Sequence, residues 1–384
     1  MSSRRSGKLY HPKDSDGRER KEWAFVVDVS LPGVLPRKQL RRSGFRTKGE
    51  AQRALTEVMS TVDHGTFVPS AALTVAEYFA GWVDSLSAAG RRPATIESYA
   101  RNVRVHVVPA IGSVKLQDLN AMHLDRLYAD LLCRRSPRTV RYVHTIVRKA
   151  LSDAMKKGLV IRNMADAATP PSAKSTRAPE MKTWTPDQLR TFLDGVAGHR
   201  LFPLFRLAAM TGMRRGELLG LRWSDVDLAT GRLVVRQQVT SVGGVIHVGQ
   251  VKTSAGRRTI TLDSHTVEVL RTHQVHQEAE QALLDIGYVD RGLVFASVEG
   301  SPIHPDSVSK AFDRLVSASG LPRIRLHDLR HTHASHLIAR DVHSKRVSAR
   351  LGHTSHSFTM DTYGHLMSDD EGEDAAAVAA LVDG

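Results

Sequence analysis

Apolar residues recur at helical spacing along most of the chain. From Thr74 onward they lie three and four positions apart, which predicts a helix that buries one face. A second pattern of this kind starts at Thr95, and two more cover residues 124–132 and 140–155. The pair Thr185-Pro186 predicts the start of a later helix, because threonine caps helices well and proline fits the first turn. The chain is therefore predicted to be mainly helical.

Near the N-terminus, apolar and polar residues instead follow the pattern of short strands. Residues 23–29 and 39–45 are predicted strands, and turn-forming residues such as Pro32-Gly33 stand between them. Thr47 is then expected to cap a helix that runs to Met59, with Glu50 three positions later completing a capping box. This part of the sequence predicts a small sheet with one helix.

A second group of strands is predicted in the later half of the chain. Residues 232–239, 245–251 and 258–262 have strand patterns, which predicts a small three-stranded sheet within a mainly helical region. Before this region, residues 167–175 are rich in Pro, Ser and Ala and have almost no large apolar residue. Such a composition is typical of a linker, which we place at residues 167–182.

The length of 384 residues allows two or three domains, each with its own core. The predicted fold class is multidomain α+β. We expect a small sheet-and-helix domain at residues 1–68 and a helical domain at 69–166. After the linker, residues 183–384 are predicted to form a mainly helical domain with the small three-stranded sheet.

The net charge of +14 and the isoelectric point near 10.1 show a strong basic excess. Such an excess attracts polyanions, so nucleic acid is the favoured partner, and a solvated basic surface is the alternative. The single cysteine, Cys133, excludes a disulfide framework, favours a reducing compartment and is expected to be buried in a helix. No apolar run is long enough to cross a bilayer, and the polar, basic N-terminus is not expected to be a secretory signal.

Side chains suited to attack on a phosphodiester stand at six positions, which are Arg214, Lys252, His327, Arg330, His353 and Tyr363. Guanidinium groups can each offer two parallel N–H groups to phosphate oxygens. A phenol has an ordinary pKa of about 10, so a tyrosine nucleophile must lose its proton as it attacks. His327 is expected to act as acid or base with a pKa near neutrality. Glu217, three residues after Arg214, is expected to contact that guanidinium on the helix surface.

The order and local context of these residues resemble the tyrosine recombinase (phage integrase) family, of the type carried by actinobacterial phages and integrative elements. The segments that carry the resemblance are Thr211-Gly212-Met213-Arg214, Val251-Lys252-Thr253, His327-Asp328-Leu329-Arg330, Leu351-Gly352-His353 and Tyr363-Gly364-His365. The resemblance implies that Tyr363 is the nucleophile, that both arginines and His353 bind the phosphate, and that Lys252 protonates the leaving oxygen. It also implies that the N-terminal domain binds arm-type DNA sites and that the helical domain binds the core site.

The function implied by the resemblance is site-specific DNA recombination through a 3′-phosphotyrosyl intermediate, which integrates a mobile element or viral genome and can excise it. No cofactor and no metal are implied. The implied partners are double-stranded attachment-site DNA, other copies of the chain in a tetramer on DNA, an excisionase and a host DNA-bending protein. We expect the protein to act at the nucleoid in the bacterial cytoplasm, and no membrane is expected among its partners.

Two other functions are compatible with the same residues. One is an enzyme that only relaxes DNA, like a type IB topoisomerase, and the other is a catalytically silent DNA-binding protein. The histidines near the proposed site also raise the question of a metal site, and the nearest are His327, His331, His333 and His336. Zinc requires three or four converging ligands, and we expect these histidines to lie on different helical faces instead.

Overall fold

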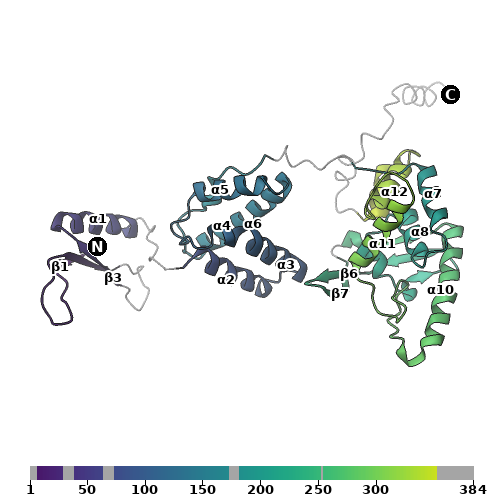
Figure 1. Cartoon of the computed structure of the whole chain (residues 1–384), viewed down its shortest axis with the longest axis horizontal. Helices are drawn as coiled ribbons and strands as arrows, with labels where there is room; N and C mark the ends of the chain where they lie inside the picture. Colours follow the sequence, from purple (N-terminus) through teal and green to yellow (C-terminus); the bar gives the residue numbers. More distant parts are fainter. Residues whose placement is uncertain (1–6, 29–38, 64–72, 173–180, 252–253, 353–384) are drawn as a thin grey trace, which may run out of the picture. The chain divides into compact units, whose positions relative to one another are not determined.

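The computed structural model describes residues 7–28, 39–63, 73–172, 181–251 and 254–352. Lys252, His353 and Tyr363 lie outside these ranges. The chain divides into two compact units, Met1–Arg177 and Ala178–Gly384. Figure 1 shows the elements of both units. Within the described residues, no helix combines the length and the apolar character that a membrane span requires.

The N-terminal part of the first unit is an antiparallel sheet in the order β1-β2-β3, packed against one helix. Its elements are β1 (Lys8–Tyr10), β2 (Trp23–Asp28), β3 (Gln39–Phe45) and α1 (Lys48–Asp63). Phe25 and Val27 of β2 pack against Leu55 of α1 in a small core. The predicted capping box is confirmed, since the Glu50 N–H donates to Thr47 Oγ1 at 3.2 Å and the Thr47 N–H to Glu50 Oε2 at 3.3 Å. Strand β1 was not predicted, because three residues are too few for a recognisable alternation.

The rest of the first unit is helical and has its own core. Its helices are α2 (Val75–Ala88), α3 (Pro93–Asn102), the π-helix η1 (Val103–Val107), α4 (Val108–Ile111), α5 (Ala121–Leu132), α6 (Pro137–Lys156) and the short η2 (Met164–Asp166). The expected start at Thr74 is confirmed by a capping box with Glu77. Helix α3 begins two residues before Thr95, because Pro93 already occupies its first turn. Cys133 is exposed rather than buried, since it follows the end of α5.

The second unit is mainly helical, as predicted, with small sheets (Figure 1). Its helices are α7 (Pro186–Gly195), α8 (Phe202–Thr211), α9 (Arg215–Leu219), α10 (Ser264–Leu284), α11 (Pro305–Ala318), α12 (Asp328–Ile338) and α13 (Ser344–Leu351), with short turns η4 (Trp223–Asp225), η5 (Ser254–Gly256) and η6 (Asp285–Gly287). The core contains an aromatic cluster in which Phe312 lies 5.2 Å from Phe192 and 5.5 Å from Phe205, measured between ring centroids. This core packs α7, α8 and α11 together.

The sheet of the second unit differs from the prediction. The three-stranded sheet has the order β4 (Val226–Asp227), β5 (Arg232–Val235) and β8 (Arg258–Thr261), and a separate hairpin pairs β6 (Gln237–Val242) with β7 (Val245–Gln250). The expected strand 232–239 therefore breaks at Arg236. There the guanidinium pairs with Asp225 at 3.2 Å and the carbonyl accepts from Val251 N–H at 3.2 Å, so the backbone leaves one sheet and enters the other.

Candidate active site

Arg214 lies in the short bend between α8 and α9. Helix α8 ends at Thr211, and Gly212 then takes the left-handed conformation with φ of +63°. Arg214 precedes α9 with extended backbone angles, so the expectation that it lies within a helix is wrong. The glycine is required for a second reason, because a Cβ there would lie 2.6 Å from a methyl carbon of Leu351. The bend brings Arg214 close to the end of α13.

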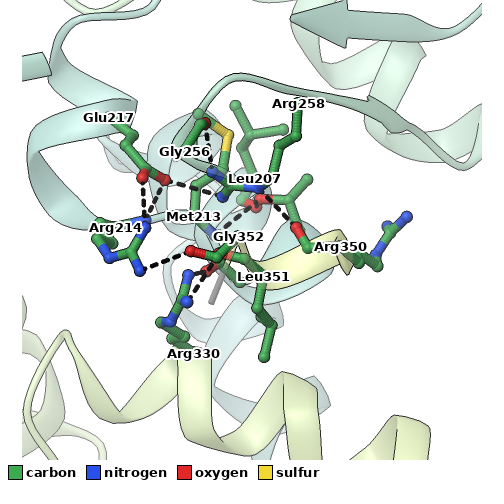
Figure 2. A network of polar contacts seen from close by, with 12 residues as sticks. Leu207, Met213, Arg214, Glu217, Gly256, Arg258, Arg330, Arg350, Leu351 and Gly352 are labelled. Atoms are coloured by element: carbon green, nitrogen blue, oxygen red, sulfur yellow. Dashed lines mark hydrogen bonds and ion pairs between the residues drawn. The ribbon is translucent and has the colours of Figure 1, made fainter. Parts of the chain in front are cut away.

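Glu217 holds Arg214 through two hydrogen bonds (Figure 2). Arg214 Nη1 donates to Glu217 Oε1 at 2.8 Å, and the Arg214 main-chain N–H donates to Glu217 Oε2 at 3.0 Å. The predicted contact is confirmed, but Glu217 is 2% exposed and does not lie on the helix surface. The Arg214 side chain remains 39% exposed. A buried carboxylate therefore anchors a guanidinium that solvent, or a phosphate, can reach.

A second arginine binds the same carboxylate. Arg258 Nη2 donates to Glu217 Oε2 at 2.9 Å, and both side chains are buried. Burial by itself would raise the pKa of Glu217, but hydrogen bonds and charges of Arg258 and Arg214 outweigh it and hold the pKa below its usual range. Sequence reasoning missed this role. The available signal was a charged residue two positions before Ile260, and thus on the buried face of β8.

Arg330 joins the ends of two helices. Its Nη1 donates to the Gly212 carbonyl at 2.6 Å and its Nη2 to the Leu351 carbonyl at 2.8 Å. Arg214 Nη2 donates to the next carbonyl, that of Gly352, at 3.0 Å. The two predicted phosphate-binding arginines therefore come from α12 and from the bend before α9, and they converge on adjacent carbonyls at the end of α13 (Figure 2).

His327 precedes α12 and is exposed. Its ring lies edge-on to the ring of His331, with 5.2 Å between centroids. Desolvation by the surrounding protein, followed by the neighbouring His331 and Arg330, lowers the pKa of His327 to about 4. The expectation of a pKa near neutrality is therefore wrong. At pH 7 the imidazole is neutral, so it can accept a proton or donate one hydrogen bond.

His333 and Arg350 form a further, half-buried contact beside this site. Arg350 Nε donates to His333 Nε2 at 3.1 Å, which requires the neutral tautomer protonated on Nδ1. Burial, followed by the charge of Arg350, lowers the pKa of His333 to about 3. In the ranges that the structure describes, no group of three or more possible metal ligands occurs. His333 thus has a packing role that the sequence did not indicate.

The remaining predicted site residues lie outside the described residues. Lys252 comes just before η5, and His353 follows Gly352 directly in the sequence. Tyr363 comes ten residues after His353. The structure thus places Arg214, Glu217 and Arg330 together and His327 at the start of the same helix as Arg330.

Known proteins resemble both the sequence and the fold. The model of the phage integrase family matches residues 182–369. An integrase of Streptomyces ambofaciens is 30% identical over 355 residues, which cover 90% of this chain and 89% of that protein. A tyrosine recombinase XerC-like protein of Caldanaerobacter subterraneus is 26% identical over 92% of this chain and 94% of its own length.

Solved structures share the fold at low identity. The Tn1549 transposon integrase in complex with transposon right end DNA superposes with a TM-score of 0.66 at 17% identity, over 81% of this chain and 100% of that one. A lambda integrase tetramer bound to a Holliday junction gives a TM-score of 0.56 at 18% identity, over 91% of this chain and 96% of that one. Together with the sequence match to the Streptomyces integrase, these comparisons show that the chain belongs to the phage integrase family of tyrosine-type site-specific DNA recombinases.

Proposed function

We propose that this recombinase cuts and rejoins attachment-site DNA through a 3′-phosphotyrosyl bond to Tyr363, and so integrates and excises a mobile element. The observation that carries the proposal is the convergence of Arg214 and Arg330 on adjacent carbonyls, with Glu217 buried behind Arg214. Two guanidiniums held side by side match the geometry of a phosphate.

The proposed reaction is a phosphoryl transfer with retention of bond energy. The Tyr363 hydroxyl attacks phosphorus, the bond from phosphorus to the 5′ oxygen breaks, and the 5′ oxygen takes up a proton. We assign the delivery of that proton to Lys252, and uptake of the phenol proton to His327, which is neutral at pH 7. Reversal by a 5′ hydroxyl of another strand rejoins the DNA.

Arg214, Arg330 and His353 are the proposed donors to the phosphate oxygens. Negative charge gathers on these oxygens as the tyrosine adds, so donors held in place beforehand stabilise the transition state. Loss of one such donor is expected to slow cleavage by about 100- to 1000-fold.

The other parts of the chain would hold the duplex. We assign arm-site binding to residues 1–68, core-site binding to 69–166, a linker to 167–182 and catalysis to 183–384. A hollow of 410 Å³ on α6 supports the assignment of core-site binding to residues 69–166, because Arg141, Arg148 and Lys149 line it and can bind phosphates. The lambda integrase tetramer on a Holliday junction supports a tetramer on DNA here as well. An excisionase and a host DNA-bending protein are further proposed partners, and the nucleoid in the bacterial cytoplasm is the proposed place of action.

The test mixes the protein with plasmids that carry DNA from either side of its own gene. The proposal predicts covalent protein–DNA adducts and recombinant plasmids. Adducts with relaxed plasmids but without recombinants would favour a relaxing enzyme. Retarded DNA with neither adducts nor recombinants would indicate a silent DNA-binding protein. Either of these two results contradicts the proposal.

A further inference from the structure

Arg258 is a buried cation to which the proposed reaction assigns no role. It is the first residue of β8 and is 9% exposed. Each nitrogen of its guanidinium donates to a different element of the second unit. Nη2 binds Glu217 of α9 at 2.9 Å, Nη1 binds the carbonyl of Gly256 in η5 at 3.1 Å, and Nε binds the carbonyl of Arg350 in α13 at 2.6 Å.

We propose that Arg258 is a positioning residue for DNA cleavage, which orients Arg214 through Glu217 and ties the end of α13 to the turn before β8. The inference rests on the proposed phosphate-binding role of Arg214. Figure 2 shows the chain of contacts from Arg258 through the carboxylate to Arg214.

The carboxylate of Glu217 is shared between the two arginines. Oε1 accepts from Arg214 Nη1, and Oε2 accepts from both the Arg214 main-chain N–H and Arg258 Nη2. A carboxylate with one oxygen on each guanidinium cannot rotate without breaking at least one charged hydrogen bond. Arg258 therefore sets the angle at which Glu217 presents Oε1, and this angle sets the direction of the Arg214 guanidinium.

The charge of Arg258 also keeps Glu217 ionised. Burial favours the protonated acid, and Arg258 is the first of the groups that oppose this effect, followed by Arg214. Without Arg258, the pKa of Glu217 is expected to rise, because only Arg214 would remain beside a buried carboxylate. A protonated Glu217 would hold Arg214 more weakly.

The end of α13 is shaped around the same guanidinium. Gly352 has φ of +69°, and a Cβ there would lie 2.9 Å from Arg258 Nη1 and 2.8 Å from the Ala255 carbonyl oxygen. The Gly352 carbonyl in turn accepts from Arg214. Arg258 and Arg214 thus both lie against the backbone at Gly352, and only a residue without a side chain allows this approach.

Lysine cannot replace the arginine in this role. A single ammonium group offers a point charge, whereas the three acceptors of Arg258 surround a planar fork. Arg258→Lys is expected to retain the fold and the ionisation of Glu217, but to lose part of the orientation of Arg214. Arg258→Met removes both the charge that keeps Glu217 ionised and the hydrogen bonds that orient Arg214 through Glu217.

The test measures single-turnover formation of the covalent complex on a nicked duplex that carries the core of the attachment site. The parent, Arg258→Met and Arg258→Lys are compared with Arg222→Met. This control is matched, because Arg222 binds the buried Asp225 at 2.7 Å and its removal leaves that carboxylate with Arg236, as removal of Arg258 leaves Glu217 with Arg214.

The expected result is a loss of about 10- to 100-fold in the cleavage rate for Arg258→Met, a smaller loss for Arg258→Lys and a rate near the parent's for Arg222→Met. DNA affinity should change little in all three variants. The rate of Arg258→Met should also fall further as the pH decreases. The same substitution in an Arg214→Lys background should cost less than about 3-fold, because its effect passes through Arg214.

Three results would overturn the proposal: an unchanged rate for Arg258→Met, an equal loss in both backgrounds, or a loss in both Arg258 variants that disappears after correction for the folded fraction. The result for the parent chain distinguishes rejection of the Arg258 role from rejection of the proposed function. If the parent forms adducts and the variants match it, only the role of Arg258 is rejected. If the parent forms none, the proposed function is rejected.

Discussion

Several arginines of the second unit donate to main-chain carbonyls at the ends of helices. Arg330 binds the carbonyls of Gly212 and Leu351, Arg214 that of Gly352, and Arg350 that of Met210. Carbonyls at a helix end carry partial negative charge and need partners. They orient a guanidinium without adding a negative charge. The one carboxylate among the described residues of this network, Glu217, is shared between Arg214 and Arg258, so a positive field remains where a phosphate is proposed to bind.

His333 should make the stability of the chain depend on pH. Its folded pKa is about 3, below the ordinary value of 6.5, so between these values the unfolded chain binds the proton and the folded chain does not. The free energy of unfolding therefore rises with pH in this window, by about 1.4 kcal/mol per pH unit from this residue, and the contribution is complete above pH 6.5. Urea unfolding at pH values from 4.5 to 7 gives the free energy of unfolding at each pH. The slope of this free energy against pH should be smaller for His333→Gln than for the parent.

The control for this measurement is His276→Gln, since His276 is exposed on α10. This variant should keep the slope of the parent. Equal slopes for the parent and His333→Gln would show that His333 is protonated in the folded chain, contrary to its contact with Arg350.

Sequence patterns predicted those side-chain contacts that are local. Arg214 and Glu217 are three residues apart, and their contact was expected. The bond from Arg258 to Glu217 spans 41 positions, and the bond from Arg330 to the Gly212 carbonyl spans 118. Such bonds depend on how elements pack, and a carbonyl acceptor leaves no trace in the side-chain pattern. The lowered pKa of His327 has the same origin, since it arises from desolvation by packed neighbours and then from His331 and Arg330.

At the scale of elements, helix ends position the candidate site. Gly212 ends α8 and Gly352 ends α13, both in the left-handed conformation. The Gly212 carbonyl binds Arg330, and the Gly352 carbonyl binds Arg214. The site is therefore built where two helices stop.

Replacing Gly212 should destabilise the chain more than replacing a glycine that has the same backbone conformation but open space. In Gly212→Ala the new methyl group would lie 2.6 Å from Leu351 Cδ2 and 3.0 Å from His333 Cδ2. The left-handed conformation alone costs about 1–2 kcal/mol for alanine, and the crowding adds to it. In the control Gly320→Ala, φ is +69° and nothing lies within 4 Å of the Cβ. Denaturant unfolding should show the larger loss for Gly212→Ala, and equal losses would contradict the tight packing.

Local signals also decided which elements could be predicted. The helix starts at Thr47, Thr74 and Thr185 were expected from sequence, and each of these residues forms a capping box with the side chain three positions later. The break between β5 and β6 was not expected. It depends on the pairing of Arg236 with Asp225 and on the partners that each strand finds in space.

At the scale of the whole molecule, separate hydrophobic cores support parts with separate tasks. The N-terminal sheet and α1 share one core, the helices from α2 to α6 share another, and the second unit has its own. A part with its own core can be removed without exposing the core of another.

Deletion of the residues before Pro69 should therefore separate two activities. The proposed arm-binding role predicts that the truncated protein loses intermolecular integration between plasmids. Cleavage of a core-site duplex should continue at a similar rate, because the helices from α2 onward and the second unit remain. Integration by the truncated protein at the level of the full chain would reject the arm-binding role.

The central claim, that Tyr363 forms the covalent bond to DNA, is tested most directly by locating the adduct. The full chain is incubated with a nicked core-site duplex, and the protein in the adduct is then digested. The DNA-linked peptide is identified by mass spectrometry. We predict that the linkage joins a 3′ phosphate to Tyr363, that Tyr363→Phe binds the duplex without forming an adduct, and that Tyr288→Phe forms it normally. Trapping of DNA by Tyr363→Phe, or a linkage to another residue, would contradict the account.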